Sequence, residues 1–271
     1  MVRLVAIVLF GLIAGCQDRP KVHSIDFVLE AEAVDPAVSA IRIVRLEDGT
    51  RWESGGERIT QRFTPASTAK IPHTVLALEL GAVSSPREIF EWDGVERFAP
   101  QWNKTQTFTE AFQNSTVWIY QQVTPRIGHA AINEGLASFA YGNADIGPPE
   151  RLQDYWLVGP LAVSAAEQVT FLSKLQRQEF PLASATYSDS RAIMRTDGGD
   201  DWSLYAKTGW KFAPDNVDIG WYVGWLEQRS GAAAGTYVFA FNMDMTVPET
   251  DRAKRRSVVV RALAEIGVDL E

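Results

Sequence analysis

Apolar and polar residues alternate with a period of two near both ends of the chain. Residues 40–53 alternate in this way on either side of Asp48-Gly49, a dipeptide that favours a tight hairpin turn. The strand pattern returns after residue 200, over residues 202–210, 219–228 and 235–245. These segments predict β-strands at both ends of the sequence.

Between about residues 84 and 190 the apolar positions recur mostly at helical spacing. The spacing is broken at 141–149 and at Gly159-Pro160, and residues 164–175 predict an amphipathic helix. A further helix is expected from Ser67 to Leu80, and a last one from Ala253 to about Ile266.

Strands at both ends with a helical region between them predict an α/β protein of the α+β type. We expect an antiparallel sheet that is flanked by the terminal helices and carries a mostly helical insertion over about 84–190. The chain has no internal repeat and no low-complexity segment.

The first sixteen residues differ from the rest of the chain. Arg3 precedes a short apolar run from Leu4 to Ile13, which predicts a secretory signal over residues 1–15 because it is too short to cross a bilayer. The run ends in Ile13-Ala14-Gly15-Cys16, which resembles a bacterial lipobox. We therefore expect lipid on Cys16 and a polar tether over 16–24; the alternative is an ordinary signal peptide cut nearby.

Composition narrows the possible partners. A formal net charge of -8 argues against nucleic acid, which requires a basic face. Cys16 is the only cysteine, so no intramolecular disulfide can form. None of the three histidines has a second one at metal-ligand spacing, so we expect no metal. The oligomeric state is left open, and any membrane contact is expected through Cys16 alone.

Lys70 stands where helix stability alone would not place it. A cation in the first turn of a helix is disfavoured by roughly 0.3–1 kcal/mol, and a capping box from Ser67 would favour Glu or Gln at position 70. Ser67 and Lys70 are three residues apart, so they are neighbours on one helix face. A desolvated lysine can act as the base that a serine nucleophile needs. For this motif alone, a capping serine beside a solvated lysine is the alternative.

Three later motifs favour the catalytic interpretation of Ser67 and Lys70 over this alternative. The chain carries Ser-x-Val at Ser115 and Val117, then Tyr-Gly-Asn at 141–143, and then Lys-Thr-Gly at 207–209. In a strand, such a glycine lets a ligand approach the backbone, while the lysine and threonine present a cation and a hydroxyl. Together and in this order, the four motifs are the signature of penicillin-recognising serine enzymes.

From about residue 40 to its end, the sequence closely resembles the class D (oxacillinase-type) serine β-lactamases. The resemblance includes FTPASTAKIPHTVLALELG, YWLVGPLAVSAAEQVTFLSKL, KTGW, GWYVGW and FAFNMDM. It implies a single catalytic domain over 25–271 with the penicillin-binding, β-lactamase-like serine transferase fold. Ala69 departs from the family, where a bulky aromatic residue is common.

The resemblance also implies roles for individual residues. Ser67 would be the acylated nucleophile, Lys70 would carry a carbamate (N6-carboxylysine) formed from carbon dioxide and act as general base, and Ser115 would relay protons. Val117 would be part of a dry wall around Lys70, and the Trp156 indole would hydrogen-bond the carbamate. No further cofactor is implied.

Substrate recognition would rest on the Lys207-Thr208-Gly209 strand and on one arginine. Lys207 and Thr208 would engage the β-lactam carboxylate, helped by Arg255, with Arg256 as the alternative arginine. The backbone N–H groups of Ser67 and Trp210 would form the oxyanion hole.

The implied activity is hydrolysis of β-lactams: penicillins, oxacillin-type compounds and some cephalosporins, conferring antibiotic resistance. A β-lactam sensor domain and a penicillin-binding cell-wall peptidase are the alternatives. The lipobox predicts an exported protein on the periplasmic side of a Gram-negative cell, and Gln17 after Cys16 suggests the outer membrane.

Overall fold

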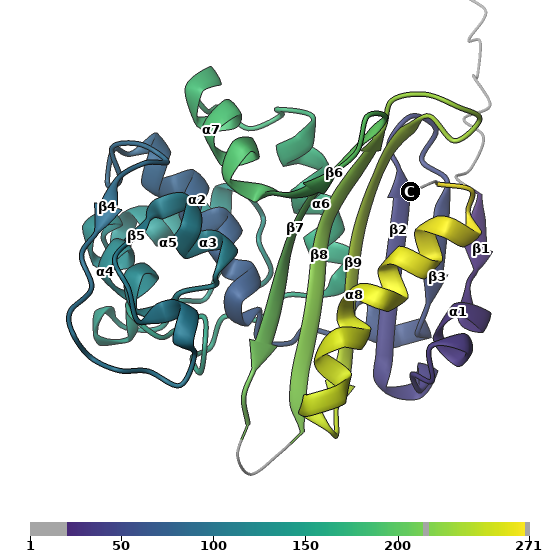
Figure 1. Ribbon diagram of the computed structural model, residues 1–271, viewed down its shortest axis with the longest axis horizontal. Helices are drawn as coiled ribbons and strands as arrows, with labels where there is room; N and C mark the ends of the chain where they lie inside the picture. The colour runs from purple at the N-terminus through teal and green to yellow at the C-terminus, as the bar shows by residue number, and fades with distance from the viewer. Residues whose placement is uncertain (1–20, 214–216, 269–271) are drawn as a thin grey trace, which may run out of the picture.

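A seven-stranded sheet forms the centre of the molecule (Figure 1). The computed structural model describes residues 21–213 and 217–268. The strands lie in the order β1-β3-β2-β9-β8-β7-β6. Their bounds are Val22–Ser24 (β1), Ser39–Arg45 (β2), Arg51–Ser54 (β3), Arg195–Gly198 (β6), Trp202–Lys211 (β7), Asp218–Gln228 (β8) and Gly235–Met245 (β9).

Helices cover both faces of this sheet. On one face lie α1 (Asp26–Ala31) and α8 (Pro248–Glu265), which crosses β8 and β9 (Figure 1). The opposite face packs against α6 (Ala165–Gln176). The other helices form a layer beside β7: α2 (Lys70–Glu79), α3 (Phe108–Gln113), α4 (Val117–Ile127), α5 (His129–Ser138) and α7 (Ser184–Met194).

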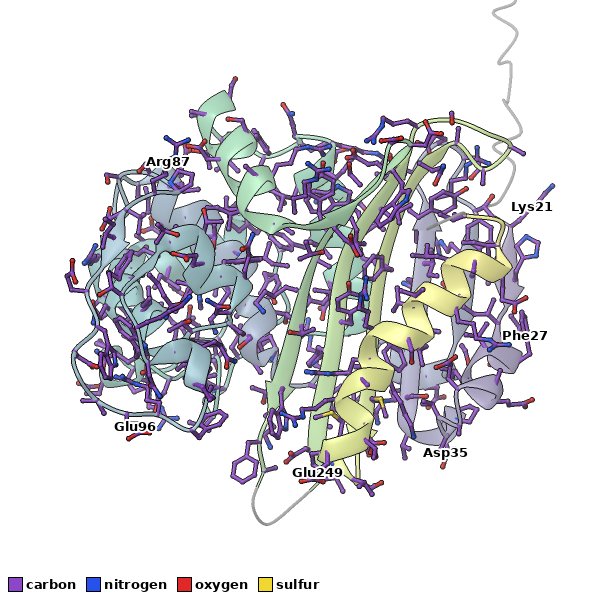
Figure 2. All side chains as sticks on the ribbon, viewed as in Figure 1. Lys21, Phe27, Asp35, Arg87, Glu96 and Glu249 are labelled. Atoms are coloured by element: carbon purple, nitrogen blue, oxygen red, sulfur yellow. The ribbon has the colours of Figure 1, made fainter. Side chains whose placement is uncertain are left out.

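The alternation of side chains along β8 explains how this strand contributes to the hydrophobic cores on both faces of the sheet. Trp221, Val223 and Trp225 belong to the core under the helical region, whereas Tyr222 and Leu226 belong to the core under α8. Successive side chains of a strand point to opposite faces, so a strand covered on both faces is apolar throughout. Figure 2 shows side chains filling both spaces, while the exposed Arg87 and Glu96 lie at the outer side of the helical region.

Short elements connect the main ones. A two-stranded sheet, unexpected from the sequence, pairs β4 (Ile89–Phe90) with β5 (Gln106–Thr107). The 3₁₀ turns are η1 (Pro36–Val38), η2 (Gly56–Ile59), η3 (Ala66–Ala69), η4 (Pro100–Trp102) and η5 (Pro149–Arg151).

The long strands and the sequence-predicted hairpin are confirmed. β2 and β3 pair antiparallel around Asp48-Gly49, and β7, β8 and β9 form an antiparallel meander. The helix predicted over 164–175 begins at Ala165, with Ser164 and Glu167 forming a capping box.

The expectation of a purely antiparallel sheet is wrong at its first strand. β1 pairs parallel with β3, with Val22 opposite Arg51 and Ser24 opposite Glu53, so the sheet is mixed. The expected tether over 16–24 is also too long, because residues 22–24 belong to the sheet. All three residues of this edge strand are exposed, including the apolar Val22.

Two helix starts also differ from the sequence-based prediction. α8 begins at Pro248 and not at Ala253, because proline is well tolerated in the first turn of a helix. The helix predicted from Ser67 starts as the 3₁₀ turn η3, and its α-helical part begins at Lys70.

Cys16 and the signal expected over 1–15 lie outside the described residues. Within the described part of the chain, no helix is long and apolar enough to cross a membrane.

Candidate active site

Ser67 lies in the first turn of a continuous helix formed by η3 and α2. The preceding Ala66 has a φ of +48°, a left-handed conformation that costs a residue with a side chain on the order of 1–3 kcal/mol. Ser67 itself is only 8% exposed. The first N–H groups of a helix have no partner within it, so the backbone of this turn can donate to a ligand.

Lys70 is fully buried, and its Nζ lies 2.9 Å from Ser67 Oγ. The same nitrogen is 4.3 Å from the centre of the Trp156 ring and 5.1 Å from that of Tyr120. Burial, reinforced by the charge of Lys207, holds the pKa of the Lys70 amine well below its usual 10.5. The neutral amine is therefore favoured, which is the form that can accept the proton of Ser67. Use of Lys70 as a base would account for a lysine in the first helical turn.

Trp156 provides an unsatisfied donor beside this amine. Its indole is fully buried, and its Nε1 has no hydrogen-bond partner among residues 21–213 and 217–268. A buried N–H without a partner costs about 1–3 kcal/mol. The position of Trp156 next to Lys70 Nζ fits a negatively charged group carried on that nitrogen, as a carbamate would be.

The Tyr-Gly-Asn motif fixes the segment that follows Trp156. Asn143 donates from Nδ2 to Pro160 O at 2.9 Å, and its Oδ1 accepts from the N–H of Ala162 at 3.0 Å. Gly142 has a φ of +59°, and a Cβ there would lie 2.1 Å from Ala162 O. This motif shapes the site wall, and its side chains serve a structural purpose.

Ser115 lies in the turn between α3 and α4 and is also in a left-handed conformation, with a φ of +59°. Its N–H donates to Phe112 O at 3.1 Å, and the Phe112 ring lies 5.5 Å from Lys207 Nζ. The turn that carries Ser115 is therefore next to β7 at the height of Lys207. Val117 begins α4 and packs against the core cluster that contains Trp156.

The free edge of β7 lies against the nucleophile turn. Pairing between β6 and β7 ends at Tyr205, and the later part of β7 contacts η3 instead. A Cβ on Gly209 would lie 2.9 Å from Pro65 O and 3.0 Å from Thr68 Cγ2. Only glycine permits this approach, which brings the backbone of Trp210 beside the turn of Ser67.

Lys207 is a buried cation at this edge. It is 4% exposed, and its Nζ donates to Thr208 O at 3.2 Å. Burial, reinforced by the charge of Arg255, lowers the pKa of Lys207 to about 7. Trp210 is held by a 2.6 Å bond from its Nε1 to Asp218 Oδ2.

The two candidate arginines take different positions around β7. Arg255 is half-buried and donates from Nη1 to Gly209 O at 2.7 Å, and burial lowers its pKa to about 10. Arg256 is exposed and donates from Nη2 to Asp197 Oδ2 at 2.8 Å. Both positions are compatible with binding an anion near Lys207.

A cavity of about 370 Å³ adjoins the Lys-Thr-Gly strand. Its wall includes Asp197, which the sequence did not indicate as a site residue because its partner Arg256 is 59 positions away. The lining residues are Phe112, Gln113, Thr196, Asp197, Ala206, Lys207, Thr208, Tyr222 and Arg256. Across residues 21–213 and 217–268, no group of His, Cys, Asp and Glu side chains could hold a metal ion.

Known proteins are similar to this chain in sequence and in fold. The family model of the penicillin binding protein transpeptidase domain matches residues 47–265. Beta-lactamase OXA-2 of Salmonella typhimurium is 41% identical over 206 residues, which cover 76% of this chain and 70% of the relative. Beta-lactamase OXA-48 of Klebsiella pneumoniae is 35% identical over 205 residues, covering 76% and 74%.

Solved structures agree with the sequence relatives. The class D β-lactamase YbXI from Nostoc aligns with a TM-score of 0.84 at 35% identity, covering 89% of this chain and 98% of that one. The class D enzyme FUS-1 (OXA-85) of Fusobacterium nucleatum aligns with a TM-score of 0.82 at 30% identity, covering 90% and 97%. The chain therefore belongs to the class D β-lactamases, within the penicillin-binding transpeptidase fold.

Proposed function

We propose that this chain hydrolyses β-lactam antibiotics through an acyl-enzyme on Ser67, with Lys70 as the general base. The observation that carries the proposal is the buried Lys70 amine, 2.9 Å from Ser67 Oγ. It lies next to the indole N–H of Trp156, which has no hydrogen-bond partner in the described part of the chain. The substrates are penicillins, including oxacillin-type compounds, and some cephalosporins, so the activity confers antibiotic resistance.

In the acylation step, Lys70 takes the proton of Ser67 as Oγ attacks the lactam carbonyl carbon. The N–H groups of Ser67 and Trp210 stabilise the negative charge that develops on the carbonyl oxygen. The lactam C–N bond then breaks, Ser115 gives its proton to the departing nitrogen, and Ser115 is reprotonated by the proton that Lys70 took from Ser67. The product of this step is an ester between Ser67 and the opened substrate.

In the deacylation step, Lys70 takes a proton from a water molecule that attacks the ester carbonyl. The bond to Ser67 Oγ breaks, and the proton returns to that oxygen. When carbon dioxide has reacted with its neutral amine, Lys70 presents an anionic base, which Trp156 Nε1 would hold by a hydrogen bond. Val117 helps to exclude bulk water from this base.

Recognition of the substrate carboxylate falls to the cationic end of the site. Lys207, Thr208 and Arg255 supply the donors, and Gly209 contributes by letting β7 lie against the turn of Ser67. A guanidinium can bind a carboxylate through two parallel hydrogen bonds, which a lysine cannot do.

Steady-state hydrolysis of a chromogenic cephalosporin by the purified protein tests the proposed activity. A β-lactamase gives many turnovers per molecule. A β-lactam sensor domain or a cell-wall peptidase would give one stoichiometric burst, because its acyl-enzyme persists. The Ser-x-Val motif favours the β-lactamase, since penicillin-binding peptidases usually carry Ser-x-Asn.

Arg255→Ala should raise KM by roughly 10–100-fold while changing kcat less, because the arginine binds the carboxylate and does not touch the reacting bond. Steady-state kinetics with benzylpenicillin measures both constants. Arg256→Ala is the matched control and should have the smaller effect. The opposite ranking would assign the carboxylate to Arg256, which lines the cavity.

We further propose that Cys16 carries lipid and anchors the exported protein to the outer membrane of a Gram-negative cell. Two or more acyl chains give stable membrane anchoring. Cys16→Ser should therefore abolish palmitate labelling and release the protein from the membrane fraction. Unchanged labelling and fractionation would contradict the anchor.

A further inference from the structure

A buried histidine lies one helical turn beyond Lys70 and has no part in the mechanism above. His73 is fully buried on α2, and its Nε2 forms a hydrogen bond with the Tyr155 hydroxyl, 82 residues away in the sequence. Tyr155 immediately precedes Trp156 and is fully buried as well. The His73 ring also meets the Trp156 ring edge to face, with 5.6 Å between centroids.

His73 is unsuited to proton transfer. Burial, followed by the charge of Lys70, lowers its pKa to about 3, so the ring stays neutral in the working range of pH. Burial raises the pKa of Tyr155 well above its usual 10, so its hydroxyl keeps its proton. The two groups form a neutral bond that is insensitive to pH between these limits.

The Trp156 ring is not fixed by a hydrogen bond to any residue that the structure describes. Its Nε1 is unpartnered among residues 21–213 and 217–268, and it lies in a stretch of turns between η5 and α6. The local backbone is held at Tyr155, whose N–H donates to Arg151 O at 2.8 Å. The orientation of the indole over Lys70 therefore depends on what packs against it and on its anchored neighbour.

We propose that the His73–Tyr155 pair is a positioning element that holds Trp156 over Lys70 and thereby sets how readily Lys70 takes up carbon dioxide. The inference rests on the proposed function, in which Trp156 donates to the group carried on Lys70. α2 carries both Lys70 and His73, so the pair ties the indole to the same rigid helix as the amine. A donor that is already in place costs no reorganisation when its acceptor forms.

Loss of this bond should weaken carbamate formation without removing any group that touches it. One hydrogen bond changes an equilibrium by about three- to tenfold. Tyr155→Phe deletes only the hydroxyl and keeps the ring volume. His73→Phe breaks the same bond from the other side, so the two effects should not add in the double variant.

The test is carbon-13 NMR of the full protein without substrate, titrated with labelled bicarbonate at fixed pH. We expect Tyr155→Phe to need about three- to tenfold more bicarbonate for half-maximal intensity of the carbamate signal. Tyr237→Phe is the matched control, because it deletes another buried hydroxyl, which donates to Ala233 O at 2.9 Å in the core beneath α8. Thermal melting of both variants shows the general effect of losing a buried hydroxyl.

A titration midpoint for Tyr155→Phe equal to that of Tyr237→Phe and wild type would overturn the positioning role. Additive effects of His73→Phe and Tyr155→Phe would also overturn it, since the two residues would then act separately. A wild-type protein without any carbamate signal would refute the carbamate on Lys70, and the inference with it, while leaving Ser67 as the nucleophile.

Discussion

Ser67→Ala should abolish turnover and covalent labelling together. The acyl bond forms on Ser67 Oγ, and no other hydroxyl lies at hydrogen-bond distance from Lys70 Nζ among residues 21–213 and 217–268. Loss of a nucleophile of this kind lowers kcat by at least about 10⁴-fold, because only binding and the oxyanion hole remain. Intact-protein mass spectrometry after mixing with benzylpenicillin measures the adduct directly.

A surface serine provides the control for this experiment. Ser188 is exposed on α7, and its hydroxyl donates only to Ala185 O in its own helix. Ser188→Ala should form one adduct and turn over like wild type. An adduct of the same mass on Ser67→Ala would place the nucleophile elsewhere.

The main elements of the fold could be predicted because their patterns are long. β8 and β9 extend over eleven residues each, and the capping residues Ser164 and Glu167 mark the start of α6. In such segments, local preference and core packing favour the same structure.

The errors arose where tertiary partners decide the structure. β1 is a three-residue exposed strand, too short to show a period, and its pairing with β3 fixes it. β6 is likewise exposed and forms because β7 offers an unpaired edge. Neither strand can be predicted from the local sequence, because a short edge strand forms through its pairing with the neighbouring strand.

In the candidate active site, too, local contacts could be predicted from the sequence and long-range contacts could not. The spacing of Ser67 and Lys70 predicted a contact within one helix turn, and the structure confirms it at 2.9 Å. The bonds from His73 to Tyr155 and from Arg256 to Asp197 join segments that are 82 and 59 residues apart. Contacts at such separations leave no periodic trace in the sequence, so the structure was needed to find them.

The second large effect is expected at Lys70, which should control deacylation. Lys70→Ala should acylate slowly and then stall as the ester on Ser67, because water needs a base to attack it. Loss of a positioned general base costs about 10²–10⁴-fold. Mass spectrometry should therefore show a persistent adduct where wild type shows a transient one. Lys174→Ala, which changes a half-buried lysine on α6, is the control and should behave as wild type.

The wild-type enzyme should depend on pH and on bicarbonate in a way that follows from the lowered pKa of Lys70. Above that pKa the amine is neutral and can react with carbon dioxide; as the pH falls through it, the amine becomes protonated and the base is lost. Activity should therefore fall in acidic, bicarbonate-free buffer and recover when bicarbonate is added at fixed pH. Trp156→Ala should keep part of the activity, and bicarbonate should restore more of it.

Carbon-13 NMR with labelled bicarbonate decides whether Lys70 carries the added carbon. We expect one carbamate resonance in wild type and in Lys174→Ala, and none in Lys70→Ala. If wild type shows no such resonance and bicarbonate never raises the rate, the base is the free amine. In that case Ser67 remains the nucleophile, because its adduct forms in the acylation step. Trp156 Nε1, which has no partner among the residues that the structure describes, would then need another acceptor.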